Sequence, residues 1–269
     1  RGARTSIHLA SAPDVAEISG QYFIDGNPTR SSAASHDQEA TDRLWHISAN
    51  LTNLPDGTVL ATGGGTEKSG FNEANAVLPA EVWDPASGSW STVASMTTPR
   101  LYHSVALLLP DGRVFVSGSG GDNGVPDERN YQIYSPSYLF KGPRPTITAG
   151  PGAVHYGAQS NISTPDAADI TSVSLIRTGS VTHSFDQNTR ALTLPFTQTS
   201  GGLNVQMPAN GNFAPPGYYM LSIVNGRGVP SVSTMVRFAA PNEDAVAPTA
   251  PSDLTATGGS DYHGTASPN

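Results

Sequence analysis

Short apolar runs separated by turn residues make up most of this sequence from residue 54 onward. Residues 105–109, VALLL, are followed by Pro-Asp-Gly and then by the apolar run VFV at residues 114–116. Apolar runs of this length, bounded by Pro, Asp and Gly, are typical of paired β-strands joined by a turn. The pattern predicts a β-hairpin, and Tyr102 and His103 stand at its open end, where both side chains have atoms that bind metals.

The same pattern occurs twice in the chain. LPDGTVLATGGG at residues 54–65 recurs as LPDGRVFVSGSG at residues 109–120, and VWDP at residues 82–85 has a counterpart in IYSP at residues 133–136. LPDG alone would indicate only a hairpin turn, whereas two matched landmarks favour kelch-type blades of a β-propeller over residues 54–142. About two blades are expected, while a closed ring takes about four to eight. Either a second chain completes the propeller or this chain is a fragment.

The pattern changes after Pro143-Arg144-Pro145. Strand candidates follow at short, irregular intervals, at residues 172–177, 191–196, 203–207, 218–224 and 231–238. Many short strands within about a hundred residues are typical of an immunoglobulin-like β-sandwich, which we assign to residues 143–240. Residues 241–269 are rich in Pro, Thr and Gly, and we interpret them as a linker or the start of a fibronectin type III-like module. The string PTAPSDLTATGGS within them resembles the opening of such a module.

The first fifty residues follow a different period. Residues 1–12 have a helical pattern, residues 20–26 form a short strand candidate between glycines, and Ser35 is a suitable N-cap for a helix over residues 36–49. The predicted fold class is therefore mainly β: a partial propeller, then an early-set, immunoglobulin-like sandwich, with a short α-containing segment at residues 1–53.

Composition narrows the functional classes. The chain has 269 residues and a net charge of -8, and its 14 Lys and Arg residues are dispersed, so nucleic acid is not an expected partner. No apolar run approaches the roughly 20 residues of a membrane span, and the first residues do not form a signal peptide. The absence of cysteine excludes disulfides and thiolate metal ligands from these residues.

Residues 2–52, which include GQYFIDGNPTRSS, resemble the C-terminal tail of short-chain dehydrogenases of the retinol-dehydrogenase-like kind. The chain has neither the glycine-rich turn after a strand nor the Tyr-x-x-x-Lys pair of that family, so dehydrogenase activity is not expected. This resemblance ends near Asn53, where a second one begins, and the join of two incomplete signatures suggests a chimeric sequence.

Four strings between residues 54 and 240 resemble, in order and spacing, the C-terminal half of the copper radical oxidases, the galactose oxidase and glyoxal oxidase family. These strings are PRLYHSVALLLPDGRV, YSPSYLFKGPRPTIT, RTGSVTHSFDQNTR and APPGYYMLSIVNGRGVPS. The resemblance implies that Tyr102, His103 and His183 bind one copper ion, with Tyr102 as the axial phenolate that accepts the substrate's hydroxyl proton. It also implies an extracellular enzyme that oxidises small alcohols, aldehydes or carbohydrates with O2 to give H2O2.

The residues themselves leave two readings open. Imidazole nitrogen and phenol oxygen suit Cu(II), but neighbours in a regular strand point to opposite faces, so Tyr102 and His103 share a metal only at a strand end or twist. A histidine at a strand entrance is otherwise a hydrogen-bonded rim residue. The family's radical tyrosine is linked to a cysteine, which is not available in this chain, so the chain alone is not expected to be fully active. The alternative function is a non-catalytic β module that binds carbohydrate or a protein partner.

Overall fold

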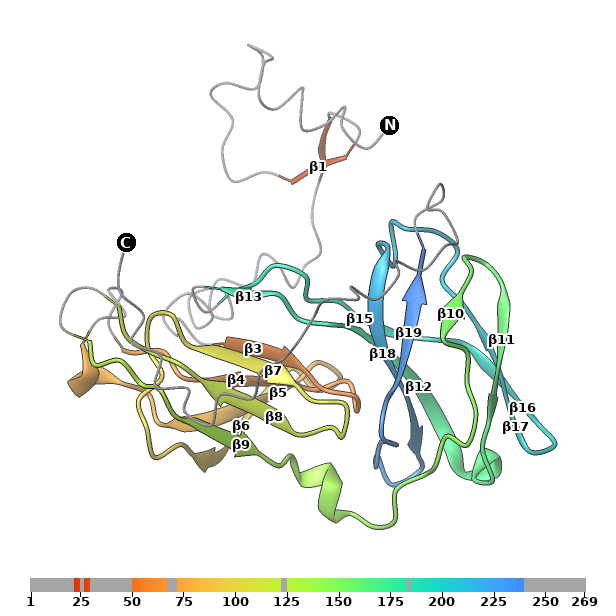
Figure 1. Cartoon of the computed structure of the whole chain (residues 1–269), viewed down its shortest axis with the longest axis horizontal. Helices are drawn as coiled ribbons and strands as arrows, with labels where there is room; N and C mark the ends of the chain where they lie inside the picture. The colour runs from red at the N-terminus through yellow and green to blue at the C-terminus, as the bar shows by residue number, and fades with distance from the viewer. Residues whose placement is uncertain are drawn as a thin grey trace, which may run out of the picture.

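The computed structural model describes residues 22–24, 27–29, 50–66, 72–121, 125–182 and 185–239 of the protein. These residues form mostly antiparallel β-strands, which the cartoon in Figure 1 shows as two groups of sheets side by side. Their helices are the short 3-10 turns η3 (Glu73–Asn75), η4 (Ser137–Phe140) and η5 (Ala167–Asp169). The prediction of a mainly β fold is confirmed.

Two repeat sheets form the first group. The first repeat sheet has the order β3-β4-β5-β6, with strands Asn50–Asn53, Val59–Thr62, Pro79–Asp84 and Ser89–Ser95. The second repeat sheet has the order β7-β8-β9, with strands Val105–Leu108, Val114–Ser117 and Tyr131–Tyr134. The sheets pack through one apolar cluster, in which Leu60 and Val114 are completely buried. Each aliphatic side chain buried in this way contributes about 1.5–3 kcal/mol to the free energy of unfolding.

The sequence repeat is also a structural repeat. In each LPDG turn the glycine amide donates to the leucine carbonyl, over 3.0 Å from Gly57 to Leu54 and 2.9 Å from Gly112 to Leu109. Both glycines have φ near +85°, at 90° and 83°, a conformation that only glycine adopts without strain. Strands β3 and β4 begin 55 residues before β7 and β8, so the offset seen in the sequence is the offset between the two hairpins.

The second group is a sandwich of two sheets. Its five-stranded sheet has the order β10-β19-β18-β12-β15, with strands Ala153–Val154, Thr234–Phe238, Gly217–Asn225, Ile170–Arg177 and Ala191–Thr193. Its three-stranded sheet has the order β11-β17-β16, with strands Gln159–Ser163, Gly202–Gln206 and Phe196–Thr199. A separate core fills the space between them and includes Leu175, Leu203, Val205, Tyr219 and Phe238.

One predicted strand of the sandwich is divided in two. Residues 191–196 were expected to form a single strand, whereas β15 ends at Thr193 and β16 begins at Phe196. Pro195 lies between them and has no amide hydrogen for a strand ladder, so the chain leaves the five-stranded sheet and enters the three-stranded one there. The strand expected at residues 231–238 begins only at Thr234, because the Ser231 amide bonds to the Ile223 carbonyl instead.

Strand β18 lies between the sandwich core and the second repeat sheet, and both of its faces are buried. Tyr219, Leu221 and Ile223 point into the sandwich core, while the alternate residues Met220 and Ser222 lie buried on the opposite face. Met220 shares a small cavity with Leu107 of β7, and the Ser233 amide donates to the Pro110 carbonyl of the second LPDG turn over 2.8 Å. The sandwich therefore rests against the second repeat sheet.

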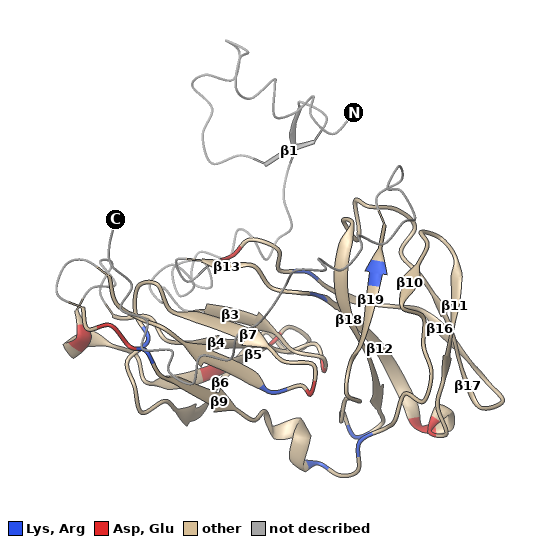
Figure 2. Ribbon diagram, viewed as in Figure 1, with Lys and Arg blue, Asp and Glu red and all other residues tan. Residues whose placement is uncertain are grey.

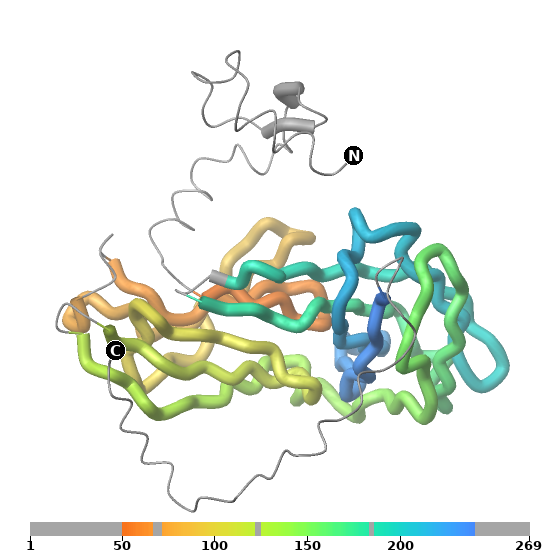
Figure 3. Tube along the Cα trace, turned by 45° about the horizontal axis from the view of Figure 1, so that its top comes forward, coloured from red at the N-terminus to blue at the C-terminus, as the bar shows by residue number. Residues whose placement is uncertain are grey.

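A hairpin extends from the sandwich across the repeat sheets. Its strands β13 (Val181–Thr182) and β14 (Phe185–Asp186) pair antiparallel. Strand β13 contacts β7, and β14 contacts β3. In Figure 3 this hairpin, drawn in teal, runs alongside the orange strand β3.

Strands β1 (Tyr22–Ile24) and β2 (Asn27–Thr29) form a separate small hairpin. The strand expected at residues 20–26 is thus present, although it stops at Ile24. The helices predicted for residues 1–12 and 36–49, and the linker predicted for residues 241–269, lie outside the described residues. Figure 2 shows the Lys and Arg residues of the described part dispersed over both groups of sheets.

Candidate metal centre

Tyr102 and His103 lie in a tight turn that leads into β7. The Ser104 amide donates to the Leu101 carbonyl over 3.0 Å, which closes a four-residue turn with Tyr102 and His103 at its centre. His103 has φ of 64°, in the left-handed region that residues other than glycine rarely adopt. A positive φ at the third residue is the sign required by a type II turn. The residue pair therefore sits before the strand and not within it.

This turn brings the two rings together. The centroids of the Tyr102 and His103 rings are 4.0 Å apart, and their planes are tilted by 35°. In a regular strand the two side chains would point to opposite faces, so the left-handed backbone of His103 is what places them on one side. Tyr102 is half-buried, while His103 is exposed. A phenol and an imidazole thus meet at the rim of the second repeat sheet.

Hydrogen bonds from distant segments fix both ends of the turn. The Leu101 amide donates to the Ser119 hydroxyl over 3.0 Å, and the Asn50 side-chain amide donates to the Ser104 hydroxyl over 2.9 Å. Leu101 and Ser104 are both buried, so these bonds form away from water. The turn is held by the loop after β8 on one side and by β3 on the other.

Arg100, directly before the turn, is the largest fully buried side chain of the described residues. Its guanidinium donates to the Gly118 carbonyl over 2.7 Å, to the Asn130 carbonyl over 3.3 Å and to the Asn130 side-chain oxygen. Burial lowers the pKa of the Arg100 guanidinium, and the nearby charge of Glu128 opposes that shift. The Nε atom of Arg100 has no hydrogen-bond partner among the described residues.

A loop with few side-chain atoms lies against one side of His103. Gly118, Ser119, Gly120 and Gly121 all have positive φ, at 76°, 125°, 117° and 116°. A Cβ atom at Gly121 would lie 2.8 Å from His103 Nδ1 and 3.7 Å from Tyr102 Cδ1. The loop therefore reaches the two rings only because it has no side chain there.

The third predicted ligand, His183, lies outside the described residues. It belongs to the segment that connects β13 to β14, and this hairpin contacts both β7 and β3. The Asp186 carboxylate accepts hydrogen bonds from the amides of Ser180, over 2.9 Å, and Asn188, over 3.0 Å, which fixes the base of the hairpin. The structure thus brings the hairpin to the strand that follows Tyr102 and His103.

The donor atoms present at the turn fit copper. Imidazole nitrogen and phenol oxygen are ligands that Cu(II) accepts in tetragonal geometry, while calcium and magnesium prefer sets of carboxylate and carbonyl oxygens. Residues 50–239, apart from the gaps in the described ranges, hold no group of three or more His, Asp or Glu that could bind a metal. Among the described residues, the turn thus offers two donor atoms, the Tyr102 phenol oxygen and a His103 ring nitrogen. A complete metal site requires further ligands.

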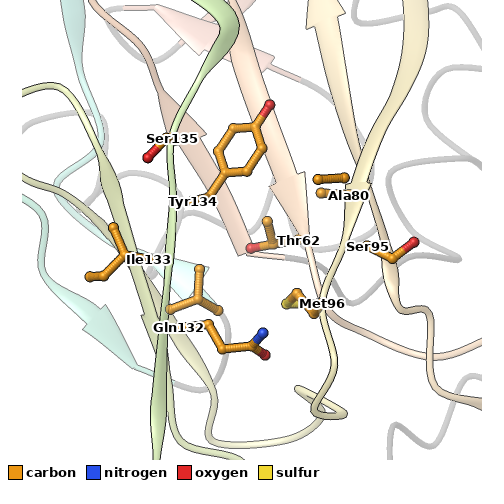
Figure 4. A pocket seen from close by; sticks show the side chains of 10 residues that line it. Thr62, Ala80, Ser95, Met96, Gln132, Ile133, Tyr134 and Ser135 are labelled. Atoms are coloured by element: carbon orange, nitrogen blue, oxygen red, sulfur yellow. The ribbon is translucent and has the colours of Figure 1, made fainter. Parts of the chain in front are cut away.

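A cavity of about 290 Å³ opens between the two repeat sheets, and Figure 4 shows it from close by. Its lining is uncharged and includes Thr62, Met96, Gln132 and Tyr134, but neither Tyr102 nor His103. Burial raises the pKa of the Tyr134 hydroxyl, and the charge of Asp56 adds to this. The cavity is distinct from the candidate metal centre.

The sequence led to the prediction of Tyr102, His103 and His183 as ligands, but it did not point to Arg100, Asn50 or Gly121. Only the glycine-rich string GSGG at residues 118–121 could have indicated a close approach of backbone to another group. The role of Arg100 depends on contacts with residues 18 and 30 positions away, and no local pattern encodes these.

Comparison with known proteins agrees with this architecture. A sequence profile of the galactose oxidase-like, early set domain family matches residues 144–238, which are the residues of the sandwich. Galactose oxidase of Gibberella zeae is 36% identical over 204 residues, which are 72% of this chain and 29% of that protein. An aldehyde oxidase of Vitis pseudoreticulata is 33% identical over 214 residues, covering 71% of this chain and 41% of that protein.

A solved structure of a fungal alcohol oxidase in complex with copper is also similar. It superposes with a TM-score of 0.66 at 32% identity, over 71% of this chain and 42% of the other. A stretch of 54 residues is 35% identical to mouse retinol dehydrogenase 12, in agreement with the resemblance of residues 2–52 to short-chain dehydrogenases. The chain spans less than half the length of each of these relatives. Within the described residues, no helix is long and apolar enough to cross a membrane.

Proposed function

Because about 70% of this chain is homologous to the copper radical oxidases, we propose that it corresponds to the C-terminal part of such an oxidase and carries part of its copper site. Residues 54–142 then represent two kelch-type blades of an incomplete propeller, and residues 143–240 the early-set sandwich. Residues 1–53 are a dehydrogenase-tail-like segment, and residues 241–269 are a linker or the start of a fibronectin type III-like module. The repeated hairpins and the separate sandwich core support these boundaries.

The copper ligands in this proposal are Tyr102, His103 and His183. The observation that carries it is the left-handed turn at His103, which places an imidazole and a phenol with ring centroids 4.0 Å apart. Strained backbone of this kind persists where the surrounding structure holds it, and it is concentrated at functional sites. The hairpin that carries His183 packs on the strand directly after this turn, which supports its inclusion.

Each side chain has a defined role in the proposed reaction. Copper, when bound, supplies one-electron redox chemistry. The imidazoles of His103 and His183 donate nitrogen lone pairs, and the Tyr102 phenolate oxygen accepts the proton of the substrate hydroxyl. Because His103 is exposed and Tyr102 half-buried, a small substrate can reach the pair from solvent. The overall reaction converts a primary alcohol and O2 into an aldehyde and H2O2, or an aldehyde, water and O2 into an acid and H2O2.

The other half of the chemistry lies outside these residues. The family's radical tyrosine is linked to a cysteine, and the 269 residues contain none. Either a second chain that completes the propeller or a part of the same protein outside these residues would contribute it, and the isolated chain would bind copper without turnover. The substrate class that follows is a small alcohol, aldehyde or carbohydrate, and the expected location is extracellular.

A copper titration tests the proposal. The parent chain, His103→Ala and His183→Ala are each titrated with Cu(II), with His155→Ala as the control because His155 is exposed on the sandwich. We expect both ligand variants to bind at least about tenfold more weakly than the parent, and His155→Ala to bind as the parent does. Equal, negligible binding in all four proteins would contradict the copper site and favour a β module that binds carbohydrate or protein.

A peroxide assay tests the second part. The purified, copper-loaded chain is incubated with galactose or methylglyoxal, and H2O2 release is measured. No release above the metal-free control is expected, since the radical tyrosine-cysteine pair is outside the chain. Sustained release would show that these residues alone are a complete oxidase.

A further inference from the structure

Three hydrogen bonds hold the guanidinium of the buried residue Arg100. A buried charge is costly unless hydrogen bonds satisfy it, and here three acceptors on two loops surround the guanidinium. One acceptor, Gly118, follows β8, and the other two belong to Asn130, directly before β9. The side chain therefore ties the entry of β7 to the ends of both other strands in its sheet.

The backbone of Arg100 is fixed from the opposite side. Its carbonyl accepts a hydrogen bond of 2.7 Å from the Gly64 amide in the first repeat sheet's glycine loop. A Cβ atom at Gly63 would lie 2.4 Å from the Arg100 carbonyl oxygen, so the two segments touch without any side chain between them. Arg100 is thus clamped by one sheet through its backbone and by the other through its guanidinium.

Gly118, which accepts a hydrogen bond from the Arg100 guanidinium, also contacts the backbone of His103. A Cβ atom at Gly118 would lie 2.8 Å from the His103 carbonyl oxygen, so the backbones of these two residues are in direct contact. The next residue, Ser119, accepts the Leu101 amide over 3.0 Å. The loop that Arg100 holds is therefore the same loop that packs on the left-handed turn.

We propose that Arg100 is a positioning residue for the metal centre: by fixing the loop at residues 118–121, it holds His103 in its left-handed conformation with the Tyr102 ring against it. The expected effect on copper binding rests on the proposed copper site. The contacts of Arg100 with the loop and of the loop with His103 do not depend on it. A left-handed residue other than glycine costs about 1–3 kcal/mol and persists only when its surroundings compensate. Without the guanidinium, the turn relaxes and the two ligands separate before any metal binds.

Arg100→Lys is the decisive variant, because lysine retains the charge but cannot form the planar fork to several acceptors. Arg144→Lys is the matched control, since Arg144 also donates to two carbonyls, of Pro230 and Ser231, both over 2.9 Å, and lies beside Gly112 at the opposite end of the β7–β8 hairpin from His103. Asn130→Ala removes one acceptor of Arg100 and serves as a milder second variant. Circular dichroism establishes that each protein is folded.

The first readout needs no metal. In the parent, we expect the Tyr102 ring, whose centroid lies 4.0 Å from that of His103, to shift the NMR resonances of the His103 ring protons away from their free values. We expect this shift to collapse in Arg100→Lys, to shrink in Asn130→Ala and to remain in Arg144→Lys. An unchanged shift in folded Arg100→Lys would overturn the inference. If Arg100→Lys does not fold, an unchanged shift in Asn130→Ala would overturn it.

The second readout is Cu(II) affinity together with the phenolate-to-copper absorption in the visible range. Arg100→Lys should bind copper about tenfold more weakly and shift this absorption band, whereas Arg144→Lys should change neither. If Arg100→Lys binds copper as tightly as the parent, the claim that Arg100 supports copper binding is overturned. A parent chain that binds no copper, but whose ring shift depends on Arg100, would refute the proposed function and leave the positioning role standing.

Discussion

His103 shows how a single backbone conformation creates the candidate site. With φ of 64°, it turns two adjacent side chains toward each other, which no regular strand does. The Tyr-His pair itself was recognised from the sequence, through its family resemblance. The conformation that makes the pair useful was not, because it depends on contacts with Gly118 and Ser119, fifteen or more positions further along the chain.

The residue-scale prediction concerns Gly121. Gly121→Ala introduces a Cβ atom 2.8 Å from His103 Nδ1 at a residue whose φ is 116°. We expect the imidazole to be displaced, with Cu(II) affinity reduced by about tenfold and stability reduced by about 1–3 kcal/mol. Isothermal titration and thermal unfolding measure the two effects.

Gly57→Ala is the control for this variant. Gly57 also has a positive φ, of 90°, but nothing lies within 4 Å of its added Cβ. It should lose about 1–2 kcal/mol of stability from backbone strain while binding copper as the parent does. Equal copper affinities in Gly121→Ala and Gly57→Ala would show that the close approach of residue 121 to His103 does not affect copper binding.

At the scale of elements, local patterns were a good guide to the repeated hairpins and a weaker one to the sandwich. The LPDG turns form because aspartate and glycine satisfy the turn within a few residues: the Asp56 and Asp111 carboxylates each accept the amide two positions later, over 3.1 Å. The division of residues 191–196 at Pro195 required knowledge of two sheets. Only the tertiary structure shows which sheet each half joins.

The element-scale prediction concerns the hairpin β13–β14. Asp186→Ala removes the acceptor for the Ser180 and Asn188 amides at the hairpin base, so we expect β13 and β14 to lose their fixed contacts with β7 and β3. We expect Cu(II) affinity to fall by about tenfold, measured by titration.

Asp84→Ala is the matched change in another turn, because Asp84 accepts the Ala86 amide and the Ser87 hydroxyl, both over 2.9 Å, between β5 and β6. It should leave copper affinity unchanged. If Asp186→Ala binds copper as tightly as Asp84→Ala, the hairpin does not position a ligand.

At the scale of the whole molecule, two cores are present and they are separate. All members of the sandwich core lie between Ile147 and Phe238, and all members of the repeat-sheet core lie between Leu54 and Leu139. The sandwich thus has the contiguous apolar interior that an independently folding domain requires. Its contacts with the repeat sheets include the hydrogen bond from Ser233 to Pro110 and the small cavity that Met220 shares with Leu107, but neither core draws a residue from the other.

The whole-molecule prediction is that a polypeptide of residues 143–239 folds alone. It should show β-type circular dichroism and a single cooperative thermal transition. Since it retains His183 but not Tyr102 or His103, its Cu(II) affinity should be at least about tenfold below that of the full chain. A non-cooperative transition would show that the sandwich depends on the repeat sheets.

The sequence by itself determined the mainly β fold, the two hairpins and the place of the Tyr-His pair, because turn residues and short apolar runs act within a few positions. It also contained the family resemblance, which named His183. Only the tertiary structure decided that Tyr102 and His103 face one another and that Gly121 leaves room for the imidazole. It also decided that Arg100 bonds to the loop at residues 118–121. These features depend on contacts between residues many positions apart, whose partners become neighbours only when the two repeat sheets have packed.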